Sequence, residues 1–396
     1  MKHANKGEWS ELYAFIKLLK EGKVYAADEN VNRIENVYFP IIKLIREEHA
    51  NEPTDYMPGQ KIKIYRNGDL IDEINSADLN HPIDVLYQRI FEGASTSGAF
   101  SIEEAEKIME TLHITKIKAP SSDKKDLTMQ IHDINTGYQP VVGFSVKSDI
   151  GNPPTLLNAG KNTRFVYEII GINDEIMQEI NAIDKSVSSE YMLARMECLF
   201  TKASKVQYHS MRSETFEDNL IMIDSRLPEL YGNMILNHFR FMGEKIYDCG
   251  LLCNILEMTN PLEYRKSDIY RYKIKKLLCA AALGMTPGAA WDGIDNASGG
   301  YIIIKKDGDV VCYHLYNRNF FEEYLLTNTA FDRPSATRHD YGYVYKSNDS
   351  YYIDFNVQIR FKSISAATKE MTFKESTLNR LKAYFEKLES CQNNIL

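Results

Sequence analysis

The segment from residue 125 to residue 148 constrains the possible folds of this 396-residue chain more than any other stretch. Apolar and polar side chains alternate along residues 125–133 and again along residues 140–148, and a turn-forming Asn-Thr-Gly sequence starts at residue 135. A period of two is typical of strands, and turn-forming residues between two such runs indicate a β-hairpin. The sequence therefore predicts two antiparallel strands with one apolar and one polar face.

The register of this hairpin follows from the length of its connection. If the connection is residues 134–139, Thr128 lies opposite Ser145 and Asp126 lies opposite Lys147. Because successive side chains of a strand point to opposite faces, an acid, a hydroxyl and an amine then meet on the polar face. The apolar face, which we expect to point to the core, consists of Leu127, Met129, Ile131, Val142, Phe144 and Val146.

The polar face carries groups that metal-assisted phosphoryl chemistry uses. A carboxylate with a second oxygen ligand can hold Mg²⁺, which prefers hard oxygen donors. A bound metal lowers the pKa of a water molecule, and a nearby lysine can orient the nucleophile or stabilise charge on the phosphate. The alternative interpretation is a surface hairpin with one cross-strand Asp–Lys pair, which stabilises a sheet by roughly 0.2–1 kcal/mol.

The order of these residues resembles a known nuclease signature. Asp126, a hairpin and then Ser145-Val146-Lys147 resemble the metal site of the PD-(D/E)xK nucleases, with serine in the second acidic position. Eight further segments, in order along most of the chain, resemble the HpaII family of type II restriction endonucleases. They are residues 5–11, 25–30, 143–148, 155–159, 334–335, 338–339, 341–342 and 356–361.

The resemblance implies Mg²⁺-dependent hydrolysis of phosphodiester bonds in double-stranded DNA, at the target CCGG. It also implies an α/β (α+β) fold, in which helices flank a central mixed β-sheet. In that interpretation Asp126 is the principal metal ligand and Ser145 lies beside the metal. Lys147 activates water or stabilises the charge that develops on the phosphate.

An amphipathic helix over residues 8–20 is expected to supply a further acid. Its apolar residues recur at i, i+3, i+4 and i+7, and Glu8 and Glu11 lie near its start. An acid there can simply complement the helix dipole. In many PD-(D/E)xK enzymes, however, an N-terminal helix delivers an extra carboxylate to the metal. Because serine at position 145 is a poor ligand, we expect Glu8 or Glu11 to complete the metal site.

Three segments are expected along the chain: a nuclease core over residues 1–200, a helical and partly basic region over 201–300, and a hairpin-rich region over 301–396 that recognises DNA. Polar and basic residues in two of these segments are candidates for phosphate contacts or for reading guanine in the major groove. The alternative is that each arginine pairs with a neighbouring acid. The candidates are Asn158, Lys161, Arg164, Arg333, Arg338, His339 and Arg360.

The remaining pattern predicts individual elements. Hairpin turns are expected at residues 66–68 and 307–308. Strands are expected over 163–170 and 351–361. Helices are expected over residues 34–50, 101–112, 173–200, 226–242, 267–283 and 370–390, with Ser101 and Ser267 as N-caps.

The formal net charge of −8 argues against a protein that coats DNA non-selectively. A nuclease remains compatible with it if basic groups are segregated. One concentration of bases, residues 265–276, carries six bases and one acid, and a solvated helix face explains it equally well.

Other patterns bear on the cellular setting. No apolar run approaches the roughly 20 residues that span a bilayer, so no membrane association is expected. An apolar signal-peptide region is missing at the N-terminus, and the six cysteines lack metal-ligand spacing, which fits a cytoplasmic protein. A homodimer is possible, and a companion DNA methyltransferase is expected in the same cell. Two alternatives stay open: a repair or junction-resolving PD-(D/E)xK nuclease, and a DNA-binding module without catalysis.

Overall fold

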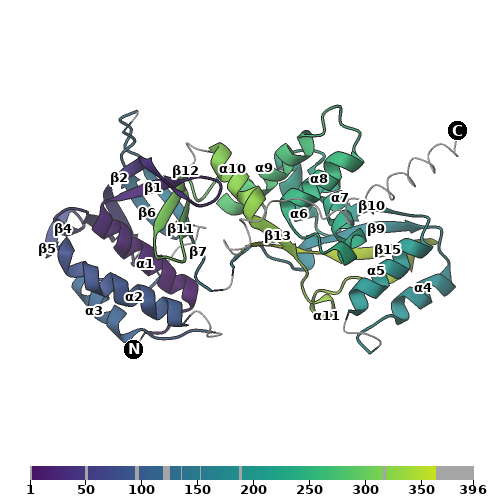
Figure 1. Ribbon diagram of the computed structural model, residues 1–396, viewed down its shortest axis with the longest axis horizontal. Coiled ribbons are helices and arrows are strands. Elements are labelled where there is room, and N and C mark those ends of the chain that lie inside the picture. Colours follow the sequence, from purple (N-terminus) through teal and green to yellow (C-terminus); the bar gives the residue numbers. More distant parts are fainter. Residues whose placement is uncertain are drawn as a thin grey trace.

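The computed structural model describes residues 2–49, 52–93, 98–118, 125–134, 136–151, 153–186, 190–314 and 318–362. These residues form two lobes (Figure 1), one built on a nine-stranded sheet and the other on a four-stranded sheet. Helices α9 (Ile269–Leu283) and α10 (Arg318–Asn328) lie between the lobes. The predicted mixed β-sheet with flanking helices is confirmed.

The nine-stranded sheet contains the hairpin that the sequence singled out. Its central strands are β11, β7 and β6, and β11 runs parallel to β7, whereas β6 and β7 are antiparallel. In spatial order the strands are β1 (Lys23–Ala27), β12 (Val310–His314), β11 (Gly300–Ile304), β7 (Val141–Ser148), β6 (Leu127–Ile131), β2 (Arg33–Glu47), β3 (Pro53–Met57), β4 (Lys61–Arg66) and β5 (Asp69–Asn75).

Helices cover both faces of the centre of this sheet. On one face, α1 (Lys6–Glu21), α2 (Asn80–Gly93) and α3 (Glu103–Thr111) enclose a core that includes the even-numbered side chains of β7 and β11. On the other face, Tyr301 and Ile303 of β11 pack into the core that α9 and α10 share. All five residues of β11 are buried, as is typical of a strand covered on both faces.

The second lobe holds the other two sheets. The four-stranded sheet consists of β10 (Lys205–Met211), β9 (Arg164–Ile170), β15 (Ser350–Asn356) and β14 (Val344–Ser347). A three-stranded sheet consists of β13 (Thr329–Asp332), β16 (Gln358–Phe361) and β8 (Thr155–Leu157). The remaining helices are α4 (Asp174–Ala182), α5 (Tyr191–Lys202), α6 (Glu214–Ile223), α7 (Leu227–Arg240), α8 (Cys249–Thr259) and α11 (Ala336–His339), with short 3₁₀ turns at Ser76–Leu79, Lys161–Thr163 and Met242–Glu244.

The register of the hairpin differs by two residues from the predicted one. Leu127 lies opposite Phe144 and Thr128 opposite Gly143, so the continuation brings Asp126 beside Ser145 rather than Lys147. The reason lies in the connection, because Pro140 has no N–H group and its carbonyl accepts a hydrogen bond from the Ile131 N–H. A shift of two residues keeps every side chain on its face, so the assignment of the apolar and polar faces is confirmed.

One predicted helix is wrong. Residues 34–50 were expected to be helical, but Arg33–Glu47 form the long strand β2, which pairs with β1, β3 and β6. The segment is rich in β-branched and aromatic residues, and Pro40 would break a helix interior. Pairing along both edges of the strand therefore overrides the weak helical spacing of its apolar residues.

Most other predicted elements are confirmed, with differences at their ends. The predicted helix over 173–200 is two helices, α4 and α5, and the strand predicted over 351–361 is divided into β15 and β16 at Val357. Neither Ser101 nor Ser267 is an N-cap: α3 and α9 follow Ile102 and Asp268, and neither of these caps with its side chain. The helix predicted over 370–390 lies outside the described residues.

The sheets do not follow the three expected segments. The hairpin formed by β11 and β12, which was assigned to a recognition region, lies in the same sheet as β6 and β7. Conversely, β9, which was assigned to the nuclease core, pairs with β10 and β15 in the second lobe. The chain thus crosses between the lobes more than once, and turn signals alone do not reveal such crossings. Within the described ranges, no helix is long and apolar enough to cross a membrane.

Candidate active site

The polar face of the hairpin brings three predicted residues into one chain of hydrogen bonds. Asp126 lies directly before β6, and its Oδ2 accepts from the Val146 N–H at 2.9 Å and from Ser145 Oγ at 3.1 Å. Lys147 Nζ donates to Ser145 Oγ at 2.8 Å. The main chain fixes the acid as well, because the Asp126 N–H donates to the Phe144 carbonyl at 2.8 Å.

A glycine allows this close arrangement. A Cβ atom at Gly143 would lie 2.9 Å from Lys125 Cβ and 3.4 Å from the Asn296 carbonyl oxygen. The Gly299 N–H also donates to the Gly143 carbonyl at 2.7 Å. Glycine at this position therefore lets the residue before Asp126 and the loop before β11 pack directly onto β7.

The structure distinguishes the two helix acids. Glu8 belongs to a capping box at the start of α1, since its carboxylate accepts from the Asn5 N–H at 2.8 Å and its own N–H donates to Asn5 Oδ1 at 3.0 Å. Glu11 instead faces the hairpin, where Lys118 Nζ lies 3.5 Å from Glu11 Oε1 and 3.9 Å from Asp126 Oδ1. Of the two candidates, Glu11 is the acid that the fold brings beside Asp126.

Burial and neighbouring charges shift the pKa values of Glu11 and Lys147. Burial, and next the charge of Asp126, raise the pKa of Glu11 from 4.5 to about 7, against the opposing effect of Lys118 and Lys147. Burial lowers the pKa of Lys147, against the charges of Asp126 and Glu11. Two carboxylates in a half-buried site disfavour each other's charge, and a divalent cation would relieve that repulsion.

The donor set fits a hard cation. Asp126 and Glu11 supply carboxylate oxygens and Ser145 supplies a hydroxyl, which suits Mg²⁺, an ion that proteins commonly hold with one or two carboxylates together with waters and substrate phosphate. Among the described residues, no group of three or more histidine, cysteine, aspartate or glutamate side chains is arranged to hold a metal. The substrate and water would therefore complete the coordination.

Sequence analysis missed two neighbours of this site. Tyr301 of β11 lies opposite Ser145, and Lys147 Nζ is 5.3 Å from the centroid of its ring. Lys118 approaches both carboxylates from a segment without a recognisable pattern. Neither residue carries a local signal, because each reaches the site through tertiary packing.

The candidate DNA contacts gather in the second lobe. Arg164 Nη1 donates to the Asp340 carbonyl at 3.0 Å, directly after α11, which carries the exposed Arg338 and the half-exposed His339. Asn158 and Lys161 are exposed on the segment that leads into β9. Residues from two distant parts of the sequence thus meet at the same end of the four-stranded sheet.

Several of the predicted arginines have partners within the protein. Arg360 Nε lies 2.7 Å from Asp332 Oδ2, and Arg164 is 3.2 Å from Asp340 Oδ2. Arg333 Nη1 lies 2.9 Å from the sulfur of Met242. For Arg164 and Arg360, the alternative interpretation of a structural ion pair therefore describes the structure, and their contact with DNA stays a prediction.

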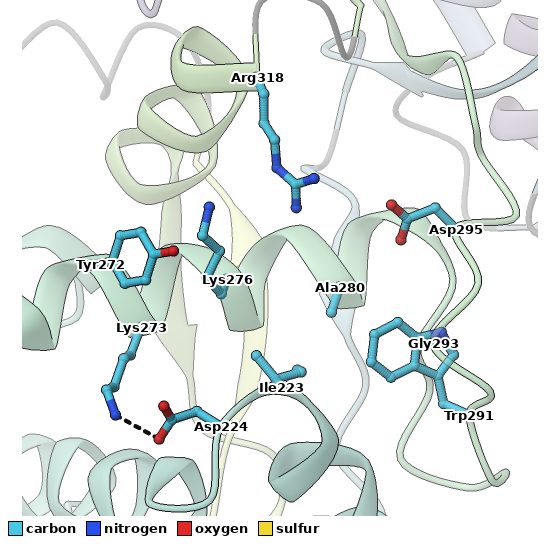
Figure 2. Close-up of a pocket in the computed structure, with 10 residues that line it drawn as sticks. All are labelled: Ile223, Asp224, Tyr272, Lys273, Lys276, Ala280, Trp291, Gly293, Asp295 and Arg318. Carbon is cyan, nitrogen blue, oxygen red and sulfur yellow. Dashed lines mark ion pairs between the residues drawn. The ribbon is translucent and has the colours of Figure 1, made fainter.

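The basic segment 265–276 is also largely neutralised. Figure 2 shows the ion pair between Lys273 and Asp224, with a distance of 2.6 Å, beside a pocket lined by Tyr272, Lys276 and Arg318. Three further bases of the segment pair with acids of α8 and α10. These pairs are Arg271 with Glu257, Lys275 with Glu323, and Lys276 with Glu322. The side chains of these four bases are only 15–29% exposed, so ion pairs within the protein, rather than a solvated helix face, account for most of this segment.

Comparison with known proteins agrees with the geometry. Residues 5–361 match the family model of the HpaII restriction endonuclease. The type II restriction enzyme HpaII of Haemophilus parainfluenzae is 36% identical over 367 residues, which cover 90% of this chain and 98% of that enzyme. No solved structure matches the chain significantly. The chain therefore belongs to the HpaII family of restriction endonucleases, which are site-specific DNA hydrolases.

Proposed function

We propose that this protein uses Mg²⁺ to hydrolyse phosphodiester bonds of double-stranded DNA at CCGG. The observation that carries the proposal is the convergence of Asp126, Ser145, Lys147 and Glu11 at the end of the β6–β7 hairpin. Family membership supports the class of reaction, and the sequence resemblance to CCGG-cutting enzymes supports the target.

Asp126 and Glu11 would hold the metal, with Ser145 as a neutral oxygen beside it. When bound, Mg²⁺ supplies a water of lowered pKa and offsets negative charge on the phosphate. Ser145 keeps Asp126 and Lys147 in place, because its hydroxyl is hydrogen-bonded to both side chains. Lys147, aimed into the site from β7, would orient the attacking water or stabilise the phosphate.

The expected oligomeric state follows from the symmetry of the proposed target. CCGG is a palindrome, and proteins that read palindromes commonly match the DNA dyad with their own two-fold symmetry, so a homodimer is part of the proposal. A companion DNA methyltransferase would protect the host DNA, and both proteins would act in the cytoplasm. The exposed Arg338, with His339, Asn158 and Lys161, forms the proposed DNA-contacting surface.

Digestion of a linear duplex with several CCGG sites tests the proposal. The wild type, K147A and the control K63A would be incubated with the duplex in Mg²⁺ and in EDTA. Lys63 lies on β4, next to the edge strand β5 of the same sheet, and its side chain is 47% exposed. We expect fragments that end at every CCGG for the wild type and K63A in Mg²⁺, and intact DNA for K147A or in EDTA.

Other outcomes would change the proposal in defined ways. Discrete fragments that end at another sequence would keep the nuclease and overturn the CCGG target. Cleavage without sequence preference would favour a repair or junction-resolving nuclease. Intact DNA with every divalent metal would favour a DNA-binding module without catalysis, and serine at position 145 would then be the first suspect.

A further inference from the structure

Lys118 lies where a cation would have to bind. Its ammonium is 3.5 Å from Glu11 Oε1 and 3.9 Å from Asp126 Oδ1, so it contacts both proposed metal-binding carboxylates at once. A metal ion held by both carboxylates would leave no room for a second cation between them. The ammonium and the metal ion therefore compete for one place.

The main chain before Lys118 is anchored by hydrogen bonds, so the fold itself places Lys118 beside the two carboxylates. Arg46, which is only 7% exposed, donates to the Ile117 carbonyl at 2.8 Å. Glu48 accepts from the Lys116 N–H at 3.2 Å. Two buried or half-buried side chains of the β2 end thus hold this segment and direct the next side chain toward the carboxylates.

A neighbouring lysine shows that the contact is specific to Lys118. Lys116, two residues earlier, directs its ammonium to the Glu48 carbonyl at 2.6 Å, away from the carboxylate pair. Both lysines are exposed, and both carry the same charge close to the site. Their comparison therefore separates a direct contact from a general effect of positive charge.

We propose that Lys118 bridges Glu11 and Asp126 in the metal-free enzyme and is displaced when the metal ion binds. The bridge offsets the repulsion between the two carboxylates until the metal arrives. Displacement is sterically open, because Lys118 also lines a hollow of about 340 Å³ together with Lys2, His3, Glu8 and Lys116. The inference rests on the metal site under Proposed function and adds a competitor for that site.

Mg²⁺ binding in the absence of DNA tests the inference without reference to activity. Isothermal titration would compare the wild type, K118M, K118R, K116M and D126N at pH 8. Methionine is nearly as long as lysine and carries no charge, so we expect K118M to bind Mg²⁺ about tenfold more tightly, equivalent to about 1.4 kcal/mol. K118R keeps a bridging cation, and K116M removes a nearby charge that is directed to the Glu48 carbonyl instead of the carboxylate pair, so both should stay within about twofold of the wild type.

The variant D126N shows whether the measured Mg²⁺ binds at the proposed site. Asparagine removes the charge of Asp126 but can still accept the hydrogen bonds from Ser145 and Val146, so the local structure should be kept. Loss of binding in D126N with unchanged or weaker binding in K118M would overturn the inference and leave the metal site intact. Equal tightening in K116M and K118M would also overturn it, since general charge would then explain the effect. Binding in D126N equal to the wild type, or no binding in any variant, would overturn the metal site and the inference with it.

Discussion

Replacement of Glu11 by glutamine should stabilise the metal-free protein at alkaline pH. The folded protein raises the pKa of this carboxyl from 4.5 to about 7, chiefly through burial and then through the charge of Asp126. At 1.36 kcal/mol per pH unit, this shift corresponds to about 3 kcal/mol. The Glu11 side chain is only 15% exposed, so solvent screens little of this effect.

The sign follows from proton binding. Between pH 4.5 and pH 7 the folded state binds more protons at Glu11 than the unfolded state does. The stability that Glu11 contributes is therefore fully present below pH 4.5 and is lost as the pH rises through about 7. Glutamine resembles the protonated acid, so E11Q should match the wild type near pH 4.5 and exceed its stability by up to about 3 kcal/mol at pH 8.

Urea denaturation of the wild type, E11Q and E8Q in EDTA at several pH values measures this difference. E8Q is the matched control, because it makes the same substitution on the same helix and glutamine can replace glutamate in a capping box. In excess Mg²⁺ the order should reverse, since the metal stabilises only a protein that binds it. An E11Q protein that is less stable than the wild type at pH 8 in EDTA would refute the reasoning, as would a difference that is independent of pH.

Three further predictions follow from individual side chains. S145A should lower kcat about tenfold in a steady-state cleavage assay, because Lys147 loses a hydrogen bond worth roughly 1.4 kcal/mol. R338A should weaken binding to a CCGG duplex by roughly 1–3 kcal/mol in fluorescence anisotropy with Ca²⁺, whereas K273A, which removes a paired lysine, should bind normally. Burial lowers the pKa of His238 from 6.5 to about 4, so the stability it contributes is full above pH 6.5 and is lost toward pH 4. H238F should lose less stability than the wild type between pH 7 and pH 5 in urea denaturation.

The sequence was sufficient for features that depend on local pattern. Parity alone placed Asp126, Ser145 and Lys147 on one face, and this assignment tolerated a register error because the shift was even. The helix over 8–20 and the hairpins at 66–68 and 307–308 followed from apolar spacing and turn residues. Each of these features is decided within about twenty residues of the chain.

Features that depend on packing could not be predicted in the same way. Glu8 and Glu11 both lie near the start of α1, and only the capping box shows that Glu8 is used at the helix end. Tyr301 reaches the site because β11 runs parallel beside β7, more than 150 residues away in sequence. The pairing of Arg360 with Asp332 likewise needs the β13–β16 contact.

The resemblance to PD-(D/E)xK nucleases leads us to expect an acid at position 145. The charges of the whole site explain why serine can stand there instead. An acid at position 145 would stand beside Asp126 and Glu11, and three carboxylates in a half-buried site would repel one another strongly. With serine, two carboxylates face two ammonium groups, those of Lys118 and Lys147, and the metal-free site is nearly balanced. In the proposed metal site, the helix would therefore supply the acid that the strand lacks, and the serine hydroxyl keeps its hydrogen bonds to Asp126 and Lys147. By this reasoning, an acid introduced at position 145 should not improve the proposed metal site unless Glu11 is replaced at the same time, because three carboxylates would otherwise repel one another.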